Sequence, residues 1–74
     1  MPSNKLLAGL GKKIRAAREA GGLSQEDAAI EADLDRAYYG RIERGQVNVS
    51  ALNLLKISKV LKTDVGDFFP KRAV

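Results

Sequence analysis

A connection of only three residues, 33–35, limits what this chain can fold into more than any other feature of its sequence. It separates two short segments, 25–32 and 36–44, in which apolar and small residues recur with helical spacing. Three residues suffice only for a tight turn, and Asp33 can adopt the left-handed backbone conformation that such a turn uses. The spacing therefore predicts a pair of short helices joined by a tight turn.

Capping residues mark the ends of this pair and of three further helices. A polar cap precedes, or a glycine follows, the helical segments at Ser24, Asp35, Gly45, Ser50 and Asp64. The three further helices are predicted over residues 4–20, 51–62 and 65–69. No segment shows the alternation of a strand, so the sequence predicts an all-α fold of five helices.

The chain has 74 residues, which is enough for one domain with a single small core. We expect this domain to span residues 1–74, with its core over residues 5–69 and short tails at 1–4 and 70–74. No apolar run is long enough for a membrane span, and no secretory signal pattern is present. A cytoplasmic protein without membrane contact is therefore expected.

Two missing residue types argue against most enzyme and metal chemistry. The chain contains no cysteine and no histidine, so it lacks thiolate chemistry and the usual acid-base group and metal ligand at neutral pH. It also lacks a phosphate-binding glycine loop and a nucleophile with a plausible base. We expect a protein that is not an enzyme and that uses no metal, no cofactor and no small-molecule ligand.

Positive charge is concentrated in two segments of the chain. The net charge is +4; residues 1–22 and 36–46 are basic, whereas residues 23–35 carry five acidic groups and no basic one. In the second basic segment, helical geometry brings five residues into one sector of about 140°. These residues are Arg36, Ala37, Gly40, Arg41 and Arg44. A helix face with positive charges and small side chains can enter the groove of a polyanionic partner, and double-stranded DNA is such a partner.

Two short helices joined by a tight turn make a helix-turn-helix, whose second helix can enter the major groove. Over residues 10–69 the sequence resembles the phage repressor and Cro class (Xre-like) of helix-turn-helix proteins. The resemblance is carried by LGKKIRAAREAGGLSQEDAA, LDRAYYGRIERG and VSALNLLKISKVLKTDVGDFF. Within that class, Leu-Asp-Arg, Asn-Val-Ser and Asp-Phe-Phe look closest to small controller proteins of restriction-modification systems. The resemblance implies a five-helix, lambda-repressor-like transcriptional regulator that binds a roughly palindromic operator as a homodimer.

The resemblance also implies roles for single residues. Arg18 and Glu43 match a partly buried ion pair between the first and third helices, and Gln25 matches a phosphate contact. Arg36, Ala37 and Arg41 match positions that face bases. Three residues depart from the family pattern: Asp33 and Lys62 stand where glycines are usual, and Tyr39 stands where Ile or Val is usual. The Tyr39 hydroxyl therefore needs a partner, either inside the protein or on a DNA phosphate.

The chemistry of the side chains supports a division between base and phosphate contacts. Arg36 and Arg41 can each donate two hydrogen bonds to guanine, and Ala37 can contact a thymine methyl group. Gly40 is expected to belong to this base-reading group, either because its missing side chain lets the helix approach DNA closely or because a glycine is merely tolerated there. Phosphate oxygens suit the further donors Gln25, Tyr38, Arg44, Gln46, Asn48, Ser50 and Asn53.

The C-terminal third of the chain is predicted to form the dimer contact. An inward stripe is expected in the fourth helix at Leu54, Leu55, Ser58 and Leu61. Apolar residues outside this stripe and in the fifth helix would pack between two protomers; these are Leu52, Val60, Val65 and Phe69. Such a contact would set the two recognition helices roughly 34 Å apart, about one turn of DNA.

A second interpretation assigns the same fold to protein-protein interaction, as in an antitoxin or the oligomerising part of a regulator. The groove-facing sector would then lack cations. Here three of its five residues are arginines, so DNA binding is the favoured function.

Overall fold

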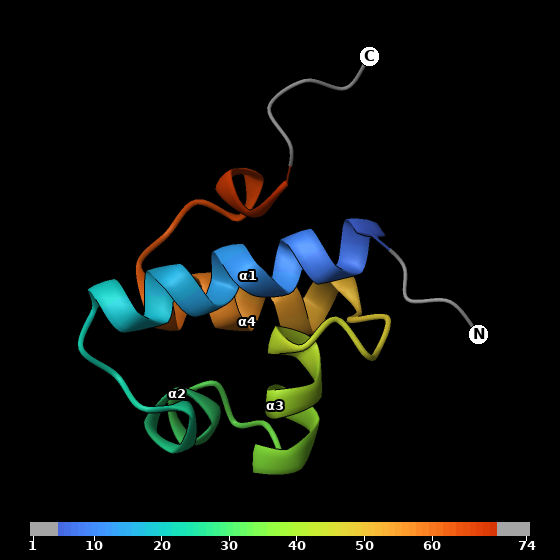
Figure 1. The fold of residues 1–74 in the computed structure, drawn as a ribbon. Helices are drawn as coiled ribbons and strands as arrows, with labels where there is room; N and C mark the ends of the chain where they lie inside the picture. Colours follow the sequence, from blue (N-terminus) through green and yellow to red (C-terminus); the bar gives the residue numbers. More distant parts are fainter. Residues whose placement is uncertain (1–4, 70–74) are drawn as a thin grey trace.

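The computed structural model describes residues 5–69, which form four α-helices and one turn of 3₁₀-helix (Figure 1). The elements are α1 (Lys5–Ala20), α2 (Gln25–Glu31), α3 (Arg36–Glu43), α4 (Ala51–Leu61) and the 3₁₀-helix η1 (Val65–Phe68). No strand occurs between residues 5 and 69, so the predicted all-α helix-turn-helix fold is confirmed. The predicted tails, 1–4 and 70–74, lie outside the described residues. None of the helices described is long and apolar enough to cross a membrane.

The fifth element corrects the prediction of five α-helices. An α-helix was expected over 65–69, but η1 has only four residues and its hydrogen bonds span three. The Asp67 amide donates to the Asp64 carbonyl over 2.9 Å, and the Phe69 amide donates to the Gly66 carbonyl over 3.3 Å. Four residues are too few to repay the cost of starting an α-helix, so the segment closes as a single tighter turn.

Side-chain caps start three α-helices and η1 as predicted. Each cap accepts a hydrogen bond from a backbone amide two or three residues further along the chain. The pairs are Ser24 with Asp27, Asp35 with Tyr38, Ser50 with Asn53 and Asp64 with Gly66, at 3.0 to 3.2 Å. These local bonds fix where the elements begin.

Two residues that replace the family's glycines adopt the left-handed backbone conformation. Asp33, in the turn between α2 and α3, has a φ of 59°, which confirms the prediction for this residue. Lys62 has a φ of 54° and ends α4 as its C-cap. An L-residue with a side chain is strained in this region, so both turns form at a small cost that glycine would avoid.

The core draws on every helix and on η1. Its largest fully buried side chains are Ile14, Tyr39, Ile57 and Phe68. The predicted stripe of α4 is wrong at one position: Leu55 is 47% exposed, whereas Ile57 is 1% exposed and takes the inward place. The reason is geometric, because successive helical residues are 100° apart and Ile57 lies closer than Leu55 to the direction shared by Leu54 and Leu61.

Two glycines let α1 lie directly on the end of α3. A Cβ added at Gly11 would collide with the carbonyl oxygens of Ile42 and Glu43, and one added at Gly45 would lie 2.7 Å from the Cα of Ala8. Gly45 also has a φ of 72°. In Figure 1, α1 crosses the molecule with α2 and α3 on one side and η1 on the other. The C-terminal end of α3 is therefore held by close backbone contact with α1.

Candidate nucleic-acid interface

The tight turn brings α2 and α3 into contact. Ala29 of α2 is buried, and its carbonyl accepts a hydrogen bond from the Leu34 amide over 2.9 Å. The Asp35 side chain then starts α3 by accepting from the Tyr38 amide over 3.1 Å. Together these contacts fix the direction in which α3 leaves the turn.

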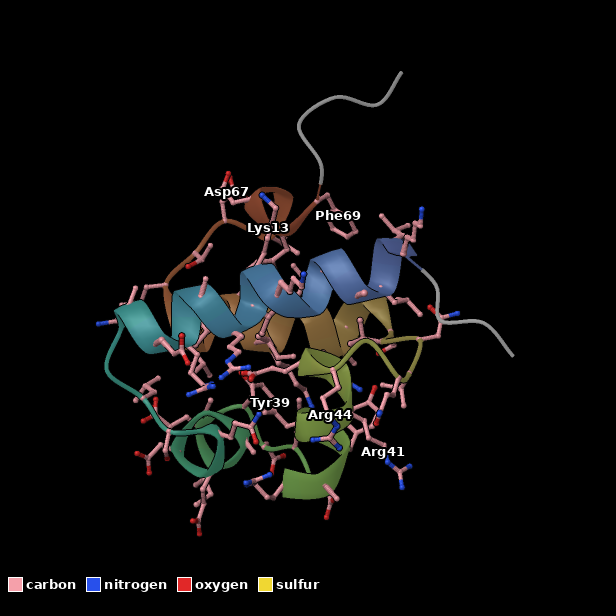
Figure 2. The ribbon with its side chains drawn as sticks, in the orientation of Figure 1. Lys13, Tyr39, Arg41, Arg44, Asp67 and Phe69 are labelled. Atoms are coloured by element: carbon pink, nitrogen blue, oxygen red, sulfur yellow. The ribbon has the colours of Figure 1, made fainter. Side chains whose placement is uncertain are left out.

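One face of α3 anchors the helix in the protein. Tyr39 and Ile42 belong to the hydrophobic core, and Figure 2 shows Tyr39 between α2 and α3. The choice left open for Tyr39, between the protein interior and a phosphate, is thus resolved in favour of the interior. Its hydroxyl is buried and has no hydrogen-bond partner within residues 5–69.

The predicted ion pair between Arg18 and Glu43 is present and buried. Arg18 donates from Nε to Oε2 of Glu43 over 2.7 Å and from Nη2 to Oε1 over 3.1 Å. Arg18 also donates to the Leu23 carbonyl over 2.9 Å. Gln25, predicted to contact a phosphate, donates to Oε1 of Glu43 over 2.9 Å. One carboxylate therefore joins α1, α2 and α3.

Burial and these contacts shift the pKa values of two acidic groups. Burial raises the pKa of Glu43, but interactions with Arg18, the Tyr39 hydroxyl and Gln25 lower it by more, so the pKa lies below its ordinary value. The Tyr39 hydroxyl lies near the carboxylate but outside hydrogen-bonding geometry, so Arg18 and Gln25 are the main causes. Burial, and then the Glu43 carboxylate, raise the pKa of Tyr39 well above its ordinary value. At neutral pH the Glu43 carboxyl group is therefore ionised and the Tyr39 hydroxyl is protonated.

The opposite face of α3 is exposed and positively charged. Arg36, Ala37, Arg41 and Arg44 are exposed, and in Figure 2 the Arg41 side chain points away from the body of the protein. No acidic residue within 5–69 forms an ion pair with any of the three arginines. Gly40 is buried beneath neighbouring side chains rather than exposed. This face can offer guanidinium donors to a polyanion.

The uncharged donors predicted to contact phosphates lie around this face and partly bond to one another. Asn53 donates to the Tyr38 hydroxyl over 3.2 Å, which ties α4 to α3. Arg44 donates from Nε to Gln46 over 3.2 Å. Asn48 and Ser50 are exposed in the connection that follows, and the Ser50 hydroxyl caps α4.

The predicted dimer residues fall into two groups. Leu52 and Phe69 are exposed, at 64% and 37%, whereas Val60 and Val65 are half-buried and pack against the core. Leu55, which the sequence placed inside, joins the exposed group. Phe69 lies on the side of α1 away from Arg41 (Figure 2), so an apolar contact there would leave α3 open.

The part of the chain that the structure describes holds no cluster of potential metal ligands. The site consists of donors on and around one helix of a helix-turn-helix, and comparison with known proteins identifies the arrangement. Residues 14–68 match the HTH_3 family, described as helix-turn-helix. This chain belongs to the HTH_3 family.

Several proteins similar to this chain are control or controller proteins. The control protein C.MunI of a Mycoplasma species is 48% identical over 58 residues, which cover 78% of this chain and 76% of the relative. The control protein C.BamHI of Bacillus amyloliquefaciens is 45% identical over 66 residues, covering 88% and 82%. The crystal structure of the restriction-modification controller protein C.AhdI from Aeromonas hydrophila superposes with a TM-score of 0.82 at 44% identity, covering 85% of this chain and 96% of that one. The predicted family, and with it a DNA-binding transcriptional regulator, is confirmed.

Three features of this site were not predicted from the sequence. The bond between Gln25 and Glu43 joins residues 18 positions apart, and the bond between Asn53 and Tyr38 joins residues 15 apart. No local pattern signals either bond. The third feature, the approach of the Arg36 and Arg44 side chains to one point above Gly40, has a signal in the sequence, since the three residues form one row at intervals of four.

Proposed function

We propose that this protein controls transcription within a restriction-modification system, by binding as a homodimer to a roughly palindromic operator. The proposal rests on three exposed arginines of α3, Arg36, Arg41 and Arg44. None of them forms an ion pair with an acidic residue within 5–69. The likeness to controller and control proteins at 44–48% identity supports the regulatory role.

In this proposal α3 enters the major groove and two side chains specify sequence. Arg41 extends away from the protein and can donate two parallel hydrogen bonds to O6 and N7 of guanine. Ala37 lies beside it on the next turn towards the N-terminus and offers a methyl group to thymine. A helix held by Tyr39 and Ile42 on its other face presents these groups with little freedom to shift.

Phosphate contacts would fix the register of the protein on the duplex. Asn48 and Ser50 lie exposed in the segment between α3 and α4. The Tyr38 hydroxyl accepts from Asn53, so its own hydrogen remains available to donate to a phosphate oxygen. Gln46 lies beside Arg44 and can reach the same strand of DNA.

A second protomer would double the surface on DNA and supply selectivity. Exposed Leu52, Leu55 and Phe69 provide apolar area on α4 and after η1 that an isologous contact could bury. A single module of this size buries too little DNA surface for tight selective binding, so two half-sites are expected.

Selection of preferred sequences from a random DNA library tests the proposal. We expect a symmetric site, and we expect Arg41→Ala to cost about 1–3 kcal/mol on that site and to relax the preference at one position in each half-site. Arg15→Ala serves as the control, because Arg15 is an exposed arginine of α1 that pairs with Glu19. An equal loss on all DNA sequences for Arg41→Ala would make Arg41 a phosphate contact, and absence of any selected site would refute the proposal.

A further inference from the structure

Two arginine side chains of α3 approach the same point above a glycine. A Cβ added at Gly40 would lie 3.2 Å from Nη1 of Arg44 and 3.4 Å from Nη1 of Arg36. Arg36 reaches this point from one turn before Gly40, and Arg44 reaches it from one turn after. A single small group at that place would therefore touch both guanidinium groups at once.

Nothing within residues 5–69 compensates the two charges that meet there. Neither arginine forms an ion pair in this part of the chain, and only Arg44 has a side-chain hydrogen bond, from Nε to the neutral Gln46. The other side chain near the point is that of Gln25, whose Oε1 would lie 3.7 Å from the added Cβ. Two cations held close together attract an anion more strongly than a neutral acceptor.

The position of the pair on α3 separates it from the proposed base contacts. Arg36, Gly40 and Arg44 form one row along the helix, and Ala37 and Arg41 form the neighbouring row. The first row borders Gln25 at the start of α2. The pair thus lies at the edge of the reading face, on the side of α2.

We propose that Arg36 and Arg44 hold one phosphate of the DNA backbone between them, above Gly40. This inference rests on the proposed DNA binding and changes the role of Arg36 from base contact to phosphate contact. Each guanidinium donates to one non-bridging oxygen of the same phosphate, and the anion offsets the repulsion between the two arginines. Gly40 is the positioning residue, because its missing side chain leaves room for the two groups to converge.

The first test separates a shared phosphate from two independent contacts. DNA affinity is measured on the selected operator over a range of salt concentrations for the wild type, Arg36→Ala, Arg44→Ala and the double variant. We expect the salt slope of the double variant to fall by about 0.9 per half-site, the value for one phosphate. We also expect its loss of affinity to be smaller than the product of the two single losses. A fall of about 1.8 per half-site would mean two separate phosphates and would overturn the proposal.

The second test uses a pair of glycines in helices. Gly40→Ala places a methyl group between the arginines, whereas Gly9→Ala adds one to α1 where nothing lies within 4 Å. Both changes favour the helix, so both variants should melt at or above the wild-type temperature. Only Gly40→Ala should weaken binding, by about tenfold and equally on all DNA sequences, as one charged contact is disturbed. Unchanged affinity of a folded Gly40→Ala variant would overturn the proposal.

Sequence selection with Arg36→Ala distinguishes this inference from the proposed function. We expect the variant to select the same operator as the wild type. A changed preference at one position per half-site would make Arg36 a base contact and overturn the shared phosphate, while leaving the regulator proposal intact. A wild type that selects no site would remove the proposed function itself.

Discussion

Arg18 of α1 and Glu43 at the end of α3 form a bidentate ion pair, with the Arg18 side chain 9% exposed and the Glu43 side chain 2% exposed. We expect Glu43→Ala to lower the free energy of unfolding by about 3 kcal/mol, because the Arg18 guanidinium would stay buried without its carboxylate. Urea denaturation measures this loss. Glu26→Ala is the control, since Glu26 is exposed on α2 and forms no ion pair within residues 5–69, so its removal should cost less than about 1 kcal/mol. Unchanged stability together with lost DNA binding would instead give Glu43 a direct role in the interface.

The same carboxylate should make the protein sensitive to acid. The pKa of Glu43 is lower in the folded protein than its ordinary value, so between the two values the unfolded chain binds more protons than the folded one. The contribution of Glu43 is therefore complete above its ordinary pKa, about 4.3, and is lost as the pH falls below it. Unfolding measured from pH 7 to pH 3 should show a shallower acid loss for Glu43→Gln than for the wild type. Parallel curves for the two proteins would contradict this expectation.

Tyr39 should produce the opposite dependence at high pH. Its pKa is raised in the folded protein, so above about pH 10 the unfolded chain loses a proton that the folded chain keeps, and stability falls as the pH rises. Tyr39→Phe removes both this titration and a buried hydroxyl that has no partner. We expect this variant to match or exceed the wild-type stability at pH 7, by up to about 1 kcal/mol, and to lose less stability between pH 9 and pH 11. A clear loss at pH 7 would show that the hydroxyl makes a stabilising bond.

Replacing two nearby glycines of α1 with alanine should change the stability of the protein in opposite directions. Gly11→Ala forces a methyl group into the backbone carbonyls of Ile42 and Glu43, which cannot move without displacing α3, so we expect a loss of about 1–3 kcal/mol. Gly9→Ala meets nothing within 4 Å and should gain about 0.5–1 kcal/mol from helix propensity. Thermal melting of the two variants measures the contrast. Equal effects would mean that α1 does not rest on α3 at Gly11.

Interactions between residues close together in the sequence could be predicted from it, whereas interactions between distant residues could not. The caps at Ser24, Asp35 and Ser50 bond to amides three residues away, so a short window of sequence contains both partners. The resemblance to a known family supplied the pair of Arg18 and Glu43, which no local pattern indicates.

Two differences from the predictions have different causes. Helical spacing already places Ile57 nearer than Leu55 to the buried side of α4, so this position was predictable from the sequence and was misassigned. The convergence of Arg36 and Arg44 on Gly40 depends on side-chain directions that the spacing permits but does not require. The residues predicted to contact bases, phosphates and a second protomer therefore remain proposals for experiment.

The apolar side chains on α4 and after η1 should determine whether the protein dimerises. Leu52 and Leu55 lie on one outer face of α4, three residues apart, and Phe69 follows η1; all three are exposed. Val60 and Val65 were also predicted for this contact, but they pack against the core, so a charged residue there would disturb folding as well as association. We therefore expect a dimer in sedimentation equilibrium for the wild type at tens of micromolar, and a folded monomer for the Leu52→Glu, Phe69→Glu double variant.

Ile30→Glu provides the matched control for this prediction. Ile30 is as exposed as Leu52, at 68%, but it lies on α2, whose neighbouring residues are acidic and whose sequence was not predicted to pair. The substitution adds the same charge to an equally exposed apolar site, so it should leave the dimer unchanged if α4 and Phe69 form the contact. A monomeric wild type would refute the dimer. Dissociation caused by Ile30→Glu but not by the double variant would move the contact to α2, where a second protomer would compete with DNA for the space beside α3.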